Sequence, residues 1–255
     1  MSARQLLRNW ALAFLTPRPL IGALHLPRYF RDWRRFARSA GRQRPRLADS
    51  YPCLGDWTTG TPFDAHYFYQ GAWLARRLVE RKPKALHVDV GSSVLTVSVL
   101  SAFTETAFVD LRPLGSRLGG LHSIAADVAH LPFAPRSLDS LSCLHVIEHI
   151  GLGRYGDSIA PDGSIKAAEV LASLVAPGGR LYLSTPVGRE RVCFNAHRVF
   201  APETIAAMFG GLTLQEFSCV DDAGRFHERV APQTAAHFDY GCGLFLFEAS
   251  VGSAT

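Results

Sequence analysis

The sequence predicts an α/β fold built around a doubly wound, mostly parallel sheet. Between residues 63 and 250, short apolar segments of strand length alternate with segments of helical periodicity. Strands that alternate with helices form parallel sheets, because each helix returns the chain to the edge where the next strand starts. In addition, 255 residues with 47% hydrophobic composition suffice for one large domain with a buried core plus an appendage.

The elements can be placed one by one. Pro83 ends the first helix, and Pro177-Gly178-Gly179 closes the third one, which is amphipathic. The last two strands follow each other without a clear helix between them, so we expect them to pair antiparallel. Helices are expected at 63–80, 94–103, 164–176 and 202–209, and strands at 85–90, 106–111, 122–127, within 137–149, and at 180–187, 212–220 and 243–250.

Polar residues mark four of the predicted strand ends. They are Asp89, Asp110, Asp127 and the group His145–His149. In a doubly wound sheet, ligands bind at the carboxyl ends of the strands. These residues are therefore the first candidates for a functional site.

Charge divides the chain into an N-terminal arm and a body. Residues 1–46 contain eleven arginines and one acid, a net charge of +10, whereas residues 47–255 carry 16 basic and 21 acidic residues, a net charge of −5. Because the body is mildly acidic, we expect no specific binding of nucleic acid. We interpret 1–46 as a basic arm, 47–62 as a linker or surface loop, and 63–255 as the main domain.

The basic arm allows three interpretations. Its apolar runs, 6–15 and 20–27, are too short to span a membrane and lack a signal-peptide cleavage site. Residues 28–38 place aromatic side chains at helical spacing among arginines. This segment could pack on the domain, lie on an anionic membrane surface, or serve as an organellar targeting signal.

Five cysteines indicate a reducing compartment. Cys53, Cys143, Cys193, Cys219 and Cys242 are odd in number, widely spaced and free of any C-x-x-C pair. This pattern argues against a disulfide framework and against a zinc knuckle. We expect a cytoplasmic protein, with peripheral contact at the inner membrane as a further expectation.

Three segments resemble the class I S-adenosylmethionine-dependent methyltransferases. Residues 126–133, ADVAHLPF, resemble the acidic loop after their third strand. Residues 137–150 resemble the fourth strand and its end, and 176–183, APGGRLYL, resemble the turn into the fifth. The resemblance runs from about residue 63 to 250. It implies a Rossmann-like fold with a mostly parallel seven-stranded sheet, an antiparallel last strand, and S-adenosylmethionine as the cofactor.

A narrower resemblance concerns an uncharacterised bacterial branch of that superfamily, often found among surface-glycan functions. It rests on HVIEHIGLGRYGD at 145–157, PDG at 161–163 and FNAHR at 194–198. The branch implies no particular substrate, so we expect a small-molecule or glycan acceptor.

The cofactor site can be assigned along the predicted strand ends. Asp110 lies 21 residues after Asp89, the spacing of the acid that binds ribose hydroxyls in Rossmann-like folds. The superfamily places three spaced glycines after the first strand, whereas this chain has only Gly91. The resemblance implies cofactor contacts from Asp89, Gly91, Ser92, Ser93, Asp110, Leu111, Asp127, Val128, His145 and Val146, with Asp127 at the adenine amino group.

Catalytic candidates gather after the fourth strand. Methyl transfer to oxygen needs a base whose pKa lies near neutrality, and histidine suits this role best. We expect His149, His197 and Glu148 to be catalytic. Arg154, Tyr155 and Asn195 lie in the segments special to the branch and are expected to line the acceptor pocket.

His145-x-x-Glu148-His149 also matches the pattern of inverted zinc peptidases. That chemistry needs both histidines on one face of a long helix, but here the motif follows a strand and is interrupted by Gly151 and Gly153. We therefore expect no metal site. The favoured function is methyl transfer, and the single-glycine loop keeps open the alternative of a catalytically inactive, methyltransferase-like binding or scaffolding module.

Overall fold

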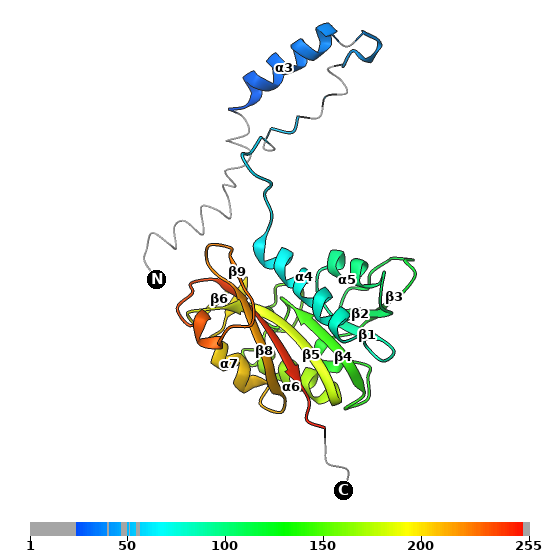
Figure 1. Ribbon diagram of the computed structural model, residues 1–255, viewed down its shortest axis with the longest axis vertical. Helices are drawn as coiled ribbons and strands as arrows, with labels where there is room; N and C mark the ends of the chain where they lie inside the picture. Colours follow the sequence, from blue (N-terminus) through cyan, green and yellow to red (C-terminus); the bar gives the residue numbers. More distant parts are fainter. Residues whose placement is uncertain (1–23, 40, 47–49, 51, 55–56, 252–255) are drawn as a thin grey trace. The chain divides into compact units, whose positions relative to one another are not determined.

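A computed structural model of the chain describes residues 24–251, except residues 40, 47–49, 51 and 55–56 (Figure 1). The chain divides into two units, Met1–Phe63 and Asp64–Thr255. The apolar run 6–15 and the first part of the run 20–27 lie outside the described residues. The candidate site belongs to the second unit.

In the described part of the second unit, eight strands form one sheet in the order β3-β2-β1-β4-β5-β10-β8-β9 (Figure 1). β3, β2, β1, β4 and β5 pair parallel, and β10 pairs antiparallel with both β5 and β8. The bounds are β1 (His87–Val90), β2 (Thr106–Asp110), β3 (Leu121–Ala125), β4 (Leu138–Leu144), β5 (Val175–Val187), β8 (Thr213–Val220), β9 (Phe226–His227) and β10 (Gly241–Glu248).

The predicted Rossmann-like sheet with its antiparallel last strand is confirmed. The number of strands differs by one, because the two-residue strand β9 pairs with the end of β8. So short a segment shows no alternation of apolar and polar residues, and therefore no pattern predicts it. A separate two-stranded sheet is formed by β6 (Arg191–Cys193) and β7 (His197–Val199).

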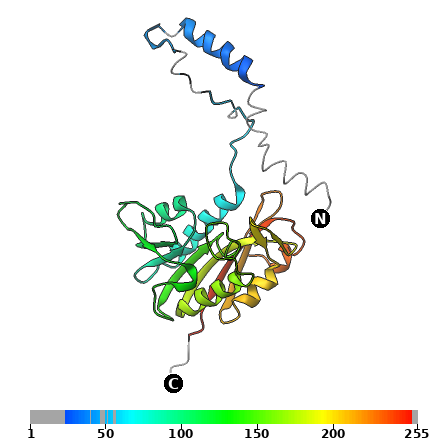
Figure 2. The same cartoon turned by 180° about the vertical axis from the view of Figure 1, so that it is seen from behind.

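Helices cover both faces of the sheet (Figures 1 and 2). On one face, the apolar side of α4 packs with strand residues in a core that includes Trp73, Leu74 and Leu78. On the other face, Leu171 and Ile205 belong to the larger core. The bounds are α4 (Ala65–Glu80), α5 (Val94–Leu100), α6 (Gly163–Leu174) and α7 (Pro202–Met208), with short 3₁₀ turns η3 (Val128–His130) and η4 (Pro232–Ala235).

One boundary differs from the expectation. The third predicted helix, α6, ends at Leu174, and Pro177-Gly178-Gly179 lies inside β5 rather than after the helix. A residue before proline is disfavoured in helical conformation, which stops the helix early. The glycines allow a close approach, since a Cβ on Gly179 would lie 2.7 Å from the carbonyl oxygen of Leu138.

A buried ion-pair network attaches α4 to β8. The Arg77 side chain is only 2% exposed and donates to Glu216, whose side chain is 10% exposed, with Nη2 to Oε1 at 2.8 Å. Trp73 Nε1 donates to the same carboxylate at 3.1 Å. Although burial opposes it, hydrogen bonds from Arg77 and Trp73 hold the pKa of Glu216 below its usual value. Arg77 also pairs with two acids that are more exposed than Glu216, namely Glu80 and Glu228.

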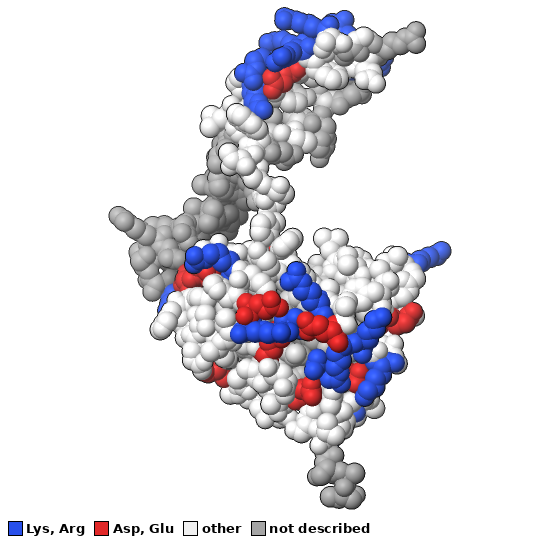
Figure 3. All heavy atoms as spheres, viewed as in Figure 1, with Lys and Arg blue, Asp and Glu red and all other residues white. Residues whose placement is uncertain are grey.

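In the first unit, the predicted helix over 28–38 is confirmed as α3 (Leu26–Ser39), which has no buried residue. Leu26, Phe30 and Phe36 are exposed along it, and arginines surround them. Figure 3 shows basic side chains gathered along α3. The sequence of α3 contains one acid, Asp32. No helix within the described residues has both the length and the apolar character needed to cross a membrane.

Membrane contact through the arm stays a prediction. We expect the protein to sediment with vesicles that contain anionic phospholipid, and to be released by high salt because salt screens surface charge. Reversing the charge of the exposed Arg31, Arg34, Arg35 and Arg38 to glutamate should abolish sedimentation. Vesicles of zwitterionic lipid serve as the control. Equal binding of the charge-reversed chain would contradict the membrane interpretation.

Candidate functional site

A cavity of about 490 Å³ lies at the carboxyl ends of β1, β2 and β4. β1 stands between β2 and β4, so the chain order of the strands reverses beside it. Doubly wound sheets bind ligands at such a switch point. The structure brings these predicted residues into the lining: Gly91, Ser92, Ser93, Asp110, Leu111, Asp127, Val128, His145, Val146, His149 and Tyr155.

Gly91 occupies the tightest point of the loop after β1. Its φ is +68°, a conformation that glycine adopts without strain. A Cβ at this position would lie 3.1 Å from a methyl group of Val146 and 3.8 Å from the carboxylate of Asp110. The glycine therefore keeps open the part of the cavity between β1, β2 and β4.

The rest of the loop is held without further glycines. Ser92 N donates to Asp89 Oδ1 at 3.1 Å, and Leu144 N donates to Ser92 Oγ at 3.0 Å. Leu95, which stands where the superfamily has a glycine, is 76% exposed on α5 and does not line the cavity. The departure from the glycine-rich pattern thus leaves the cavity open.

A buried polar chain runs beneath the loop. Ser142 Oγ donates its single proton to Asp89. The same oxygen must therefore accept the hydrogen bond from His87 Nε2, 2.9 Å away. Because the neutral ring carries its proton on Nε2, His87 Nδ1 accepts from Ser140 Oγ at 2.8 Å. Burial raises the pKa of Asp89 to about 6 and lowers the pKa of His87 to about 3. Asp89 supports the loop from below and does not itself line the cavity.

Two acids point into the cavity from neighbouring strand ends. Asp110, with a side chain 20% exposed, ends β2 and accepts from Arg112 N at 2.7 Å. Asp127 caps η3 by accepting from Ala129 N at 2.9 Å. Both acids therefore stabilise turns and, at the same time, offer carboxylate oxygens to a ligand.

Glu148 does not itself line the cavity, but it contacts His145 and lies near His149, which together with Val146 form the part of the lining here called the Glu148 wall. Glu148 is completely buried, and its Oε1 accepts from His145 Nδ1 at 2.8 Å and lies 3.7 Å from His149 Nε2. His149 Nδ1 donates to the carbonyl oxygen of Ala196 at 2.7 Å. Burial lowers the pKa of His149, with the charge of Glu148 opposing this shift. The ring is therefore neutral at neutral pH, with Nε2 free to accept a proton.

Besides Asp89 and Glu148, three more predicted residues lie outside the lining. His197, at the start of β7, packs against Tyr240 with ring centroids 4.9 Å apart, and burial lowers its pKa. Arg154 donates to the carbonyl oxygen of Ala196 at 2.9 Å, and its guanidinium lies 5.0 Å from the ring centroid of Tyr155. Asn195 is exposed in the turn between β6 and β7.

The three branch segments, 145–157, 161–163 and 194–198, contact one another through Arg198. Arg198, only 7% exposed, donates from its backbone to the carbonyl oxygen of Glu148 at 3.0 Å. Its guanidinium donates to the carbonyl oxygens of Ile150 and Pro161, and to Ser164 Oγ. Arg198 therefore holds the loop after β4 in place.

Sequence reasoning missed the contribution of α4. Tyr67 lines the cavity, and its ring stacks on His145 with centroids 5.6 Å apart. His66 stacks on the same ring at 5.6 Å. The available signal was the polar pair His66-Tyr67, two and three residues after the N-cap Asp64, which apolar periodicity alone does not single out.

Comparison with known proteins identifies the family. Residues 93–227, more than half of the chain, match the family described as "Caenorhabditis protein of unknown function, DUF268". The chain belongs to this family. The matched segment begins at Ser93, just before α5, and contains both cavity acids and residues 145–149, but not Gly91 or Ser92. That description names no reaction.

Individual relatives are methyltransferases. The chain is 27% identical over 123 residues to a ubiquinone biosynthesis O-methyltransferase of Xanthomonas euvesicatoria, and this match covers 44% of the chain and 47% of the relative. The chain thus spans about half the length of the curated relative it matches.

Solved structures show the fold. The N-methyltransferase NodS of Bradyrhizobium japonicum, in complex with S-adenosylhomocysteine, is 16% identical, with a TM-score of 0.53, and the match covers 84% of this chain and 97% of NodS. A 1,6-didemethyltoxoflavin-N1-methyltransferase of Burkholderia thailandensis is 14% identical with a TM-score of 0.50, over 73% and 80% of the two chains. The fold is that of class I S-adenosylmethionine-dependent methyltransferases. Assignment to a bacterial branch stays a prediction.

Proposed function

We propose that this protein binds S-adenosylmethionine in the cavity and transfers its methyl group to a small-molecule or glycan acceptor. The observation that carries the proposal is the meeting of three elements in one cavity. These are the loop at Gly91, the carboxylate of Asp110 and the carboxylate of Asp127, each at the carboxyl end of a different strand. When bound, the cofactor supplies an electrophilic methyl group on a sulfonium.

The residues present fit this cofactor. Asp110 offers a carboxylate to vicinal hydroxyls of a ribose, and Asp127 offers one to an exocyclic amine, as acceptors of charge-assisted hydrogen bonds. The space beside Gly91 is one that any side chain would partly fill. The serines of the loop keep this space open while tying the backbone down.

The residues of the Glu148 wall would remove the proton from the acceptor. His149 is held in one tautomer by its bond to the carbonyl oxygen of Ala196, which leaves Nε2 as the basic atom. After taking a proton from the acceptor, the imidazolium would be stabilised by Glu148, 3.7 Å away. Tyr155, whose ring packs edge-on against His149, and Tyr67 provide apolar walls for the acceptor.

Cofactor binding is testable without knowing the acceptor. We expect titration calorimetry to detect binding of S-adenosylmethionine and of S-adenosylhomocysteine. Replacing Asp110 by alanine should weaken both by about 10- to 100-fold, because a hydrogen bond to a charged group contributes about 1.5–3 kcal/mol.

Glu105→Ala is the matched control. Glu105 directly precedes β2, whereas Asp110 ends the same strand, and the Glu105 side chain is 59% exposed. This variant should bind like the wild type. Unchanged binding by Asp110→Ala would move the cofactor away from this cavity. If the folded wild-type protein binds neither ligand, the alternative of an inactive binding module replaces the proposed function.

A further inference from the structure

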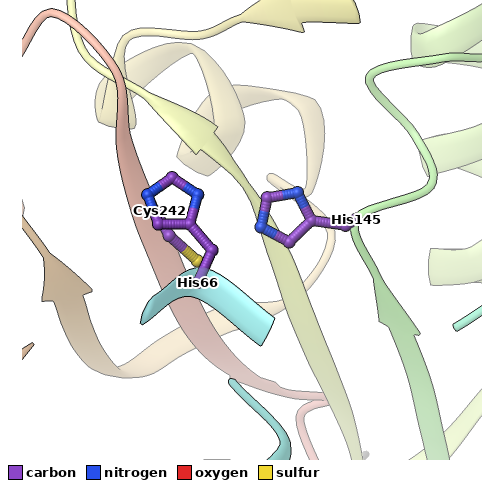
Figure 4. A group of neighbouring side chains, drawn as sticks. All are labelled: His66, His145 and Cys242. Carbon is purple, nitrogen blue, oxygen red and sulfur yellow. The ribbon is translucent and has the colours of Figure 1, made fainter. Parts of the chain in front are cut away.

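We propose that His66, His145 and Cys242 bind a zinc ion beside the cavity. The three residues come from α4, from the residue after β4 and from β10, and Figure 4 shows their side chains converging. One donor atom from each lies within 4.8 Å of the other two. Among the described residues, no other group of three histidine, cysteine or acidic side chains meets in this way.

The surroundings of His145 suit a metal ligand. Its side chain is 6% exposed, and its Nε2 is buried without any hydrogen-bond partner. Leaving such an atom unpaired costs about 1–3 kcal/mol, and a metal bond would remove this cost. Its other nitrogen, Nδ1, donates to Glu148 at 2.8 Å. Histidines that bind zinc characteristically donate their second nitrogen to a carboxylate, which fixes the tautomer and orients the ring.

Cys242 supplies a soft donor. It is fully buried, and its Sγ lies 3.9 Å from the carbonyl oxygen of Gly243 and interacts with the side chain of His145. One thiolate and two imidazoles suit zinc better than magnesium or calcium, which prefer oxygen ligands. Ligand atoms of a tetrahedral zinc site lie about 3.3–3.6 Å apart, so binding would draw the three side chains together by about 1 Å.

The arrangement also resembles a cysteine–histidine–glutamate nucleophilic triad, but the burial of the cysteine opposes that chemistry. Cys242 has no exposed surface, so a substrate cannot reach its sulfur. A metal ion, unlike a substrate, can occupy a buried position.

Three protein ligands leave one coordination position for water or for a heteroatom of the acceptor, as in catalytic zinc sites. Because His145 also lines the cavity, this position would border the acceptor. Only the role of the metal toward the acceptor rests on the proposed function. The zinc site itself stands on the geometry of the three ligands.

Metal content tests the site. Full-length protein that is supplied with zinc and then dialysed should contain about one zinc ion per chain, as measured by inductively coupled plasma mass spectrometry. Cys242→Ser and His66→Ala should each lower the zinc content by at least about tenfold. Cobalt should give a thiolate charge-transfer band that Cys242→Ser abolishes. Zinc should also raise the thermal midpoint of the wild type but not of Cys242→Ser.

Cys219→Ser is the matched control. Cys219 is equally buried, and it lies on β8 opposite Gly243, outside the cluster. This variant should keep its zinc. A wild-type protein without zinc and without a cobalt spectrum would overturn the site, as would full zinc content in Cys242→Ser. Zinc binding without any binding of S-adenosylhomocysteine would leave the metal site intact and contradict the proposed function alone.

Discussion

Arg77→Met is expected to lower the free energy of unfolding by about 3–5 kcal/mol. The substitution leaves the carboxylate of Glu216 only 10% exposed and without its main partner. Removing one member of a buried ion pair costs more than the pair contributes, because the remaining charge stays desolvated. Glu80 and Glu228 are about half exposed, so water replaces Arg77 there at little cost. Urea denaturation followed by circular dichroism gives the free energy.

Two comparison variants separate the buried charge from other effects. Arg76 is the adjacent residue on the exposed side of α4, so Arg76→Met should change stability by less than about 0.5 kcal/mol. Adding Glu216→Gln to Arg77→Met removes the unpaired charge and should recover part of the loss. If the double variant is no more stable than Arg77→Met, desolvation of Glu216 is not the cause.

The second large effect concerns pH. In the wild type, His87 and Asp89 should change the free energy of unfolding in opposite directions between about pH 7 and pH 4, so that their effects nearly cancel. The pKa of His87 falls from an ordinary 6.5 to about 3 on burial, so acid favours the unfolded chain by about 3 kcal/mol over this range. The pKa of Asp89 rises from 3.8 to about 6, so acid favours the folded chain by about 2–3 kcal/mol.

Single variants should reveal each contribution. Relative to the wild type, His87→Gln should become more stable by about 3 kcal/mol as the pH falls from about 7 to 4, because the unfolded chain no longer gains that proton. Asp89→Asn should become less stable by about 2–3 kcal/mol over the same range. Denaturation curves of the three proteins at both pH values measure this. Parallel pH profiles for all three would mean that neither buried group titrates in this window.

The same buried chain explains how a loop with one glycine keeps its shape. Asp89 accepts from the backbone of Ser92 and from Ser142, and Ser92 accepts from Leu144. Side-chain hydrogen bonds thus fix a turn that relatives of the superfamily build with several glycines. Only Gly91 has a positive φ within this loop.

Much of the fold could be predicted from local pattern. Alternating strand and helix segments gave the parallel sheet, and the missing helix before 243–250 gave the antiparallel pairing of β10 with β8. The rule that ligands bind at strand ends selected Asp110, Asp127 and His145, which meet in one cavity. These predictions succeeded because they depend on residues close in sequence and on the direction of parallel strands.

Other features depended on how distant segments pack. The sequence placed Asp89 among the cofactor ligands, yet its side chain lies below the loop, because alternate residues of a strand face opposite sides. His66 and Cys242 lie 79 and 97 residues from His145, so no spacing rule connects them. The pairing of Arg77 with Glu216 joins a helix to a strand 139 residues away.

By itself, the sequence determined the fold class, the order of the elements and the acids at the strand ends. The tertiary structure decided which polar side chains are buried together, such as His87 with Asp89 and His145 with Cys242. The physical reason is that secondary structure follows from the periodicity of neighbouring residues, whereas burial, pKa values and ligand geometry depend on side chains that only the packed sheet and its helices bring within a few ångströms.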